Sequence, residues 1–121
     1  MAIKNLAFKG GGVLGIAYAG AIQVLEQRGV LKTVERVAGT SAGAITAALV
    51  ALKYTSAEIT QIVNATNFED FQDKPRPLKA LHNYGLYQGD FFLAWMQDKL
   101  VKKGLSTSTT FQSLKGARWL S

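Results

Sequence analysis

Two turns near the start of the chain constrain its fold more than any other feature. The stretch "FKGGGVLGIAYAG", residues 8–20, and the stretch "ERVAGTSAGAITAAL", residues 35–49, each lead from a short apolar run through glycines into an alanine-rich segment. Short apolar runs bounded by glycine are typical of buried parallel strands, and the longer segments that follow are typical of helices. The order strand, helix, strand, helix predicts an α/β fold with a parallel sheet covered by helices.

The rest of the sequence is predicted to be mostly helical. Thr55-Ser56-Ala57-Glu58 is a capping box, which begins a helix that runs to about Ala65. We also expect strands at 3–8 and 34–38, helices at 13–28, 42–54 and 91–103, and an irregular connection at 67–77. Residues 78–84 are expected to form a helical turn or short helix, and residues 106–114 a cap followed by one more short helix. Because two strands do not make a stable sheet, further strands should follow, and "ARWLS" could begin one.

Length and composition are those of one globular domain. The chain has 121 residues, of which 48% are hydrophobic and 18% are charged, and this supplies enough apolar side chain for a core. It contains no cysteine, so disulfides and thiolate metal sites are excluded. We interpret residues 1–121 as the front part of a single catalytic domain, truncated before its sheet is complete.

The net charge of +6 is unevenly distributed. Residues 99–121 contain five basic and no acidic residues, whereas residues 1–98 nearly balance, with nine basic and eight acidic groups. A basic segment can bind nucleic acid or anionic lipid, but we favour a solvated helix end. The sequence has no interleaved pattern of arginine and aromatic residues, so we expect no nucleic-acid partner.

The start of the chain resembles a secretion signal only superficially. Lys4 and Lys9 precede an apolar run from Val13 to Leu25, but three consecutive glycines interrupt the pattern. No run reaches the roughly 18 to 20 apolar residues of a membrane span. We therefore expect a cytoplasmic protein or one that contacts a membrane surface.

The first turn, Gly10 to Gly15, fits the pattern G-x-G-x-x-G after a strand and before a helix. In dinucleotide-binding proteins this turn holds pyrophosphate at the amides of the helix N-terminus. That function also needs an acidic residue at the end of the second strand, whereas Glu35 stands at its start. A P-loop is disfavoured because no Gly-Lys-Ser or Gly-Lys-Thr follows the glycines. Nucleotide binding is therefore the weakest hypothesis.

The second turn contains "GTSAG", residues 39–43, which is the pattern G-x-S-x-G between a strand and a helix. This is the context of a nucleophile elbow, in which a sharply turned backbone exposes a serine hydroxyl. The residues two before and two after the serine crowd each other, so glycine is favoured at both positions. The alternative is a structural role for Ser41 as the N-cap of the helix.

Parallel strands deliver their carboxyl ends to the same edge of a sheet, so the two turns should lie side by side. Gly10, Gly11 and Gly12 would then present backbone amides next to the Ser41 hydroxyl. Acyl transfer needs this arrangement, because amides stabilise the oxyanion that develops when a serine attacks an ester. The positive end of the helix that starts near Val13 would add to this stabilisation.

With "GGGVLG" at 10–15, "GTSAG" at 39–43 and "GLYQGDFF" at 85–92, the sequence resembles the patatin-like phospholipase family. The resemblance covers nearly all of this chain but only the front of the family's domain, a three-layer α/β hydrolase fold with a parallel sheet. It implies a serine acyl hydrolase that uses a serine–aspartate dyad without cofactor or metal, and a phospholipid or another acyl ester as substrate.

The resemblance also implies roles for individual residues. It assigns the nucleophile to Ser41, the oxyanion hole to Gly10, Gly11 and Gly12, and motif positions to Gly15, Gly39 and Gly43. The family often has a basic residue where this chain has Leu14, so a phosphate contact at that position is in doubt.

The general base is missing from this sequence. In the family it is an aspartate in a downstream Asp-Gly-Gly or Asp-Gly-Ala turn, and this chain contains no Asp-Gly dipeptide. Asp90 better fits a helix cap, and we expect Asp70, Asp73 and Asp98 to be surface residues. The single histidine, His82, has no recognisable orienting carboxylate. We therefore expect this chain alone to be inactive or nearly so, and a longer parent to hydrolyse acyl esters.

The predicted helix at 91–103 carries an apolar stripe formed by Phe92, Leu93, Met96 and Leu100. Such a stripe could meet a lipid surface, but it more often packs in a core, and we favour the core. If strands are missing, an exposed face could drive formation of a homo-oligomer. The second hypothesis for the whole chain is a catalytically incomplete patatin-fold module that binds lipid or a partner.

Overall fold

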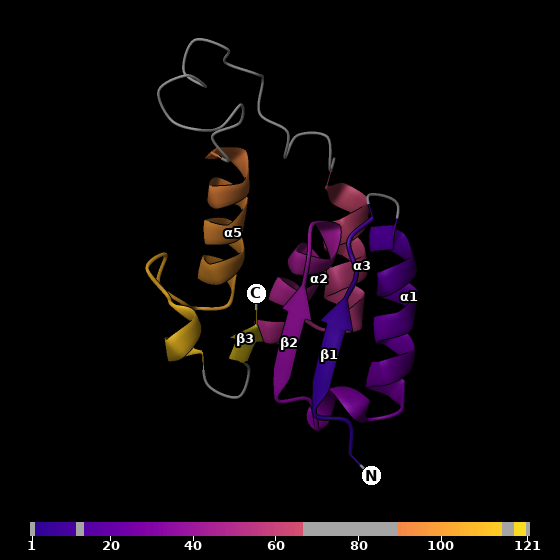
Figure 1. Cartoon of the computed structure of the whole chain (residues 1–121). Coiled ribbons are helices and arrows are strands. Elements are labelled where there is room, and N and C mark those ends of the chain that lie inside the picture. Colours follow the sequence, from indigo (N-terminus) through magenta and orange to yellow (C-terminus); the bar gives the residue numbers. More distant parts are fainter. Residues whose placement is uncertain (1, 12–13, 67–89, 115–117, 121) are drawn as a thin grey trace. The chain divides into compact units, whose positions relative to one another are not determined.

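The computed structural model describes residues 2–11, 14–66, 90–114 and 118–120 (Figure 1). The chain divides into two compact units, one formed by residues 1–66 and 108–121 and the other by residues 67–107. The expected connection at 67–77 and short helix at 78–84 lie outside the described residues.

The first unit contains a parallel sheet with the strand order β1-β2-β3. The strands are β1, Asn5–Phe8; β2, Arg36–Gly39; and β3, Arg118–Leu120. Phe8 pairs with Gly39, so β1 and β2 end next to each other. The parallel sheet and the strand in "ARWLS" confirm the sequence predictions, although β2 begins two residues later than expected and ends one residue later.

Three α-helices accompany the sheet: α1, Leu14–Gln27; α2, Ala42–Ala51; and α3, Ser56–Ala65. Two short 3-10 helices, η1 (Val30–Lys32) and η3 (Phe111–Ser113), belong to the same unit. The capping box that begins α3 is confirmed, because the Thr55 hydroxyl accepts from the Glu58 amide at 3.2 Å and the Glu58 carboxylate accepts from the Thr55 amide at 3.1 Å. These two bonds satisfy amides that the first helical turn leaves without a partner.

α2 ends three residues before the expected position at Tyr54. Lys53 has a left-handed backbone, with φ 63°, and the Tyr54 amide returns to the Leu49 carbonyl at 3.1 Å. The Lys53 amide donates to the Val50 carbonyl at 3.0 Å. Together these bonds form a Schellman motif, which ends a helix by satisfying its last carbonyls. Glycine usually occupies the left-handed position. This chain has a lysine there, which explains why the end of α2 was not predicted from the sequence.

The core is centred on α2, which packs against β1 and β2, while α1 packs against α3 and α2 (Figure 1). Nine of the ten residues of α2 are buried, as expected for a helix that is apolar on all sides. The largest fully buried apolar side chains are Ile22, Val37, Leu49 and Ile59. Each such side chain contributes roughly 1.5–3 kcal/mol through removal of apolar surface from water.

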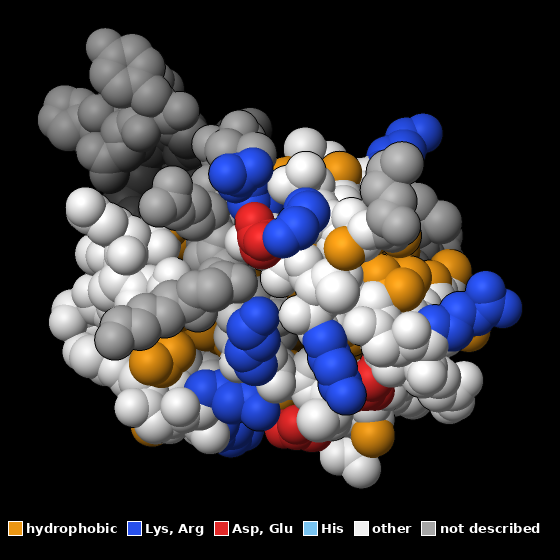
Figure 2. Space-filling model, turned by 90° about the horizontal axis from the view of Figure 1, so that it is seen from below, with side chains coloured by type: hydrophobic (Ala, Val, Ile, Leu, Met, Phe, Trp, Pro, Cys, Tyr) orange, Lys and Arg blue, Asp and Glu red, His pale blue; other side chains and the backbone are white. Residues whose placement is uncertain are grey.

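Basic side chains gather at the end of the first unit where β1 and β2 begin. Lys4, Arg28, Lys32, Arg36 and Lys53 are exposed at this end. Seen from there, Lys and Arg side chains spread over the surface with few acidic side chains between them (Figure 2).

The second unit contains α5, Asp90–Lys102. Asp90 is the first residue of this helix rather than the residue before it. Leu100 is buried as predicted, but Leu93 is 57% exposed, so the prediction of a fully buried stripe is wrong for the first turn of α5. There the aromatic side chains pack along the helix itself, and the rings of Phe92 and Trp95 are stacked with their centroids 6.4 Å apart. In the described part of the chain no helix is both long enough and apolar enough to span a bilayer.

Candidate active site

Ser41 lies in the turn between β2 and α2, and its side chain is exposed. Its backbone has φ 53° and ψ −129°, a conformation that costs a non-glycine residue about 1–3 kcal/mol. Ser41 occupies the N-cap position of α2, but its side chain makes no capping hydrogen bond. The structural alternative, in which the hydroxyl caps the helix, is therefore wrong, and the strain presents a hydroxyl that the helix does not use.

Gly39 and Gly43 are required by close backbone contacts around this turn. A Cβ atom on Gly39 would overlap the carbonyl of Gly43, and a Cβ atom on Gly43 would overlap the carbonyl of Phe8 at the end of β1. Any side chain at either position would push the first turn of α2 away from the sheet. The two glycines thus allow α2 to begin directly over the ends of both strands.

The glycine turn after β1 lies against Ser41, as predicted from the parallel order. A Cβ atom placed on Gly10 would be 3.1 Å from the Cβ atom of Ser41. The Gly10 amide donates a hydrogen bond to the Thr40 hydroxyl at 3.0 Å, and the Thr40 amide donates to the Phe8 carbonyl at 3.2 Å. These two bonds join the turns, and they give Thr40, which sequence reasoning did not single out, a positioning role.

Two further residues shape the glycine turn. The Tyr18 hydroxyl donates to the carbonyl of Lys9 at 2.6 Å, and the Tyr18 ring meets the Phe8 ring edge-to-face, with centroids 5.3 Å apart. Gly11 has φ 151°, a region that essentially only glycine occupies. Gly12 lies outside the described residues, and Gly15 is in the first turn of α1.

Two helices start at the candidate site. α1 follows the glycine turn and α2 follows Ser41 directly, and no acidic residue stands in the first turn of either helix. Their positive ends are therefore not neutralised by a side chain of their own. Among the described residues, the Ala42 amide at the start of α2 has no backbone acceptor. In nucleophile elbows the amide after the nucleophile helps to bind the oxyanion, so Ala42 joins the candidates that sequence reasoning missed.

Two of the described acidic residues, Asp98 and Glu35, are held in ion pairs. Asp98 lies in α5 and forms ion pairs with Lys102 at 3.0 Å and Lys99 at 3.1 Å. The hydrogen bond from Lys102 lowers the pKa of Asp98 most, and the hydrogen bond from Lys99 lowers it further. Glu35 pairs with Lys4 at the start of β2, far from the glycine turn, which argues against a nucleotide-ribose contact. Asp70, Asp73 and His82 lie outside the described residues.

A family model of the patatin-like phospholipases matches residues 6–115. The chain belongs to the patatin-like phospholipase family. Its α/β fold is the patatin fold of two solved bacterial proteins. VipD from Legionella pneumophila is 30% identical with a TM-score of 0.66, over 83% of this chain and 17% of that one. Full-length ExoU from Pseudomonas aeruginosa, solved in complex with SpcU, is 28% identical with a TM-score of 0.58, over 83% of this chain and 18% of that one.

A curated relative is the uncharacterized protein YqhO of Bacillus subtilis, which is 46% identical over 107 residues. The match covers 81% of this chain and 36% of the relative. The chain thus spans about a third of the length of this relative and less than a fifth of the length of VipD and ExoU.

Proposed function

We propose that this chain carries the nucleophile and oxyanion hole of a serine acyl hydrolase that acts on phospholipids or related acyl esters at a membrane surface. The observation that carries the proposal is the exposed, strained Ser41 with Gly10 packed against it. Family membership supports an ester substrate. No other described serine combines a positive φ with a position after a strand and before a helix.

In the proposed reaction the Ser41 hydroxyl oxygen attacks the ester carbonyl carbon and passes its proton to a carboxylate base. The tetrahedral oxyanion collapses, the carbon–oxygen bond to the alcohol breaks, and the alcohol leaves with that proton. Water then attacks the acyl-serine by the same route and releases the fatty acid. Backbone amides bind the oxyanion in both steps, and each donor is worth about 3 kcal/mol of barrier.

The oxyanion donors are assigned to the amides of Gly11, Gly12 and Ala42. Gly10 was expected to contribute as well, but its amide already donates to the Thr40 hydroxyl, so we assign Gly10 the role of holding the turn against Ser41. The positive ends of α1 and α2 add to the same potential. Thr40→Val should loosen the turn while leaving Ser41 in place, because it removes only the hydroxyl acceptor.

The base is expected to be an aspartate outside these 121 residues. The resemblance places it in an Asp-Gly turn, and this chain has none. The same fact favours a second candidate function, a catalytically incomplete patatin-fold module that binds lipid or a partner. The two candidates differ in whether Ser41 is reactive.

A fluorophosphonate probe tests the reactivity of Ser41. We expect slow, stoichiometric labelling of the chain at Ser41, because the helix ends and amides stabilise the adduct even without the base. Ser41→Ala should abolish the labelling, and the matched variant Ser106→Ala, at an exposed serine in the second unit, should leave it unchanged. Absence of labelling in the folded chain, together with binding to phospholipid vesicles, would support the module instead.

A further inference from the structure

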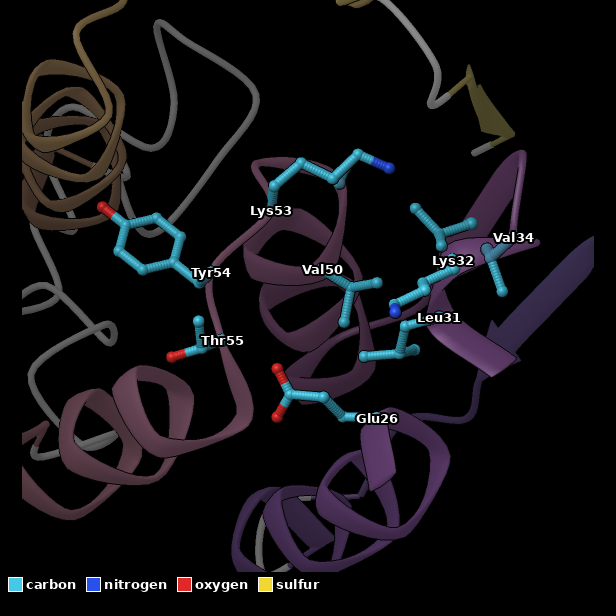
Figure 3. A pocket seen from close by; sticks show the side chains of 10 residues that line it. Glu26, Leu31, Lys32, Val34, Val50, Lys53, Tyr54 and Thr55 are labelled. Atoms are coloured by element: carbon cyan, nitrogen blue, oxygen red, sulfur yellow. The ribbon is translucent and has the colours of Figure 1, made fainter. Parts of the chain in front are cut away.

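A cavity of about 270 Å³ lies at the other end of α2 from Ser41 (Figure 3). It is enclosed by the carboxyl ends of α1 and α2, by η1 and by the start of β2. α2 has ten residues, so at 1.5 Å per residue its two ends are about 15 Å apart. The cavity is therefore separate from the candidate active site.

The walls of the cavity are apolar and buried. Val34 and Val37 line it from β2 and the residues before it, and Val50 and Ala51 line it from the last turn of α2. None of these four residues is more than 8% exposed. A surface of this kind favours an apolar ligand group over water, since water needs two or more polar partners to occupy a cavity.

The opening of the cavity is polar and carries two lysines. Lys32 comes from η1 and Lys53 follows α2, and both are exposed. Figure 3 shows the Lys32 side chain extending from η1 toward Val50. Lys53 occupies the left-handed position of the Schellman motif, where glycine would be less strained. The chain therefore holds an ammonium group at this opening at a cost in stability.

The acidic residue of the cavity, Glu26, has a structural partner. Its carboxylate accepts a hydrogen bond from the amide of Ser56 at 3.1 Å, and Ser56 is the first residue of α3. The positive end of α3 thus offsets the charge of Glu26. The charged residues that line the cavity are Glu26, Lys32 and Lys53, which carry one negative and two positive formal charges, on the basic end of the unit shown in Figure 2.

We propose that this cavity binds a monocarboxylate with an unbranched apolar chain of six to eight carbons. The apolar chain of this ligand lies against the buried valines, and its carboxylate lies at the opening between Lys32 and Lys53. A cavity of about 150 Å³ accommodates benzene, which has six carbons. By the same ratio, 270 Å³ holds about eleven non-hydrogen atoms, which is enough for octanoate. The proposal is independent of the chemistry at Ser41.

The test is a titration of the Ser41→Ala chain with octanoate, followed by methyl NMR. We expect saturable shifts at Val34, Val37 and Val50, with a Kd on the order of 0.1–1 mM for a ligand of this size. Octylamine should bind at least tenfold more weakly because it meets two ammonium groups, and acetate should produce no shift at the valines. Equal binding of octylamine, or no valine shifts with octanoate, would overturn the proposal.

Matched variants separate the effect of the two lining lysines on binding from the effect of positive charge elsewhere on the surface. Lys32→Gln and Lys53→Gly should each weaken octanoate binding three- to tenfold, and Lys53→Gly should not unfold the chain because it relieves a left-handed backbone. Arg28→Gln removes the same charge from the end of α1 without lining the cavity, and it should change the Kd less than twofold. An equal loss in all three variants would reduce the effect to general charge attraction and contradict the assigned site.

A second titration tests whether the cavity binds the apolar chain of a free acid or that of a phospholipid. Dihexanoylphosphatidylcholine presents six-carbon acyl chains, within the proposed range of lengths, without a free carboxylate. We expect it to shift the valines less than octanoate does at equal concentration. Stronger binding of the phospholipid than of the free acid would show that the opening does not select a carboxylate, and would refute the proposal.

Discussion

Ser41 and Lys53 share an uncommon feature at the scale of single residues: among the described residues they are the two non-glycine positions with positive φ. One stands before α2 and the other after it. Strain of this kind persists only where the surrounding structure imposes it, and it clusters at functional sites. Each of the two proposed sites contains one of these residues.

The backbone strain at Ser41 should be measurable through its effect on the free energy of unfolding. Ser41→Gly should raise the free energy of unfolding by about 1 kcal/mol, because relief of about 1–3 kcal/mol of backbone strain exceeds the added entropy of glycine in the unfolded chain. Ser41→Ala also removes the hydroxyl but keeps the strain, so it should change stability by less than about 0.5 kcal/mol. Urea unfolding compares the two variants, and equal stability of both would show that the backbone is not strained.

The ion pair of Glu35 and Lys4 predicts a pH effect. The hydrogen bond and charge of Lys4 lower the pKa of Glu35 below its ordinary value of 4.5. The pair therefore stabilises the fold above that value, and its contribution is lost as the pH falls through the lowered pKa. In Lys4→Met the carboxyl carbon shift of Glu35 should titrate at higher pH, whereas Lys9→Met should leave it unchanged. An unchanged pKa of Glu35 in Lys4→Met would contradict the pairing.

At the scale of elements, two glycines in helices have opposite roles. Gly43 allows α2 to meet β1, whereas a Cβ atom on Gly20 of α1 would meet nothing within 4 Å. Gly43→Ala should therefore destabilise the chain by at least about 2 kcal/mol through overlap with the strand. Gly20→Ala should stabilise it by about 0.5–1 kcal/mol through helix propensity. Thermal unfolding of the two variants measures both effects. Similar effects of both substitutions would mean that α2 does not pack closely on β1.

At the scale of the whole molecule, catalysis is proposed to depend on residues outside this chain. Joining residues 1–114 to the corresponding remainder of YqhO should raise ester turnover by about 10³- to 10⁶-fold over the 121-residue chain, because the proposed aspartate base is expected in that remainder. Ser41→Ala in the same chimera should remove the gain. Strong turnover by the 121-residue chain alone would show that its own residues complete the dyad.

The sequence by itself determined the order of strands and helices, the need for glycine at positions 39 and 43, and the family. These features depend on residues a few positions apart, where apolar periodicity and backbone crowding act locally. Only the tertiary structure decided that the Gly10 amide is held by Thr40, thirty residues away, and that α2 ends at a lysine above an apolar cavity. Such contacts join segments whose separation in sequence carries no local pattern, because packing rather than propensity brings them together.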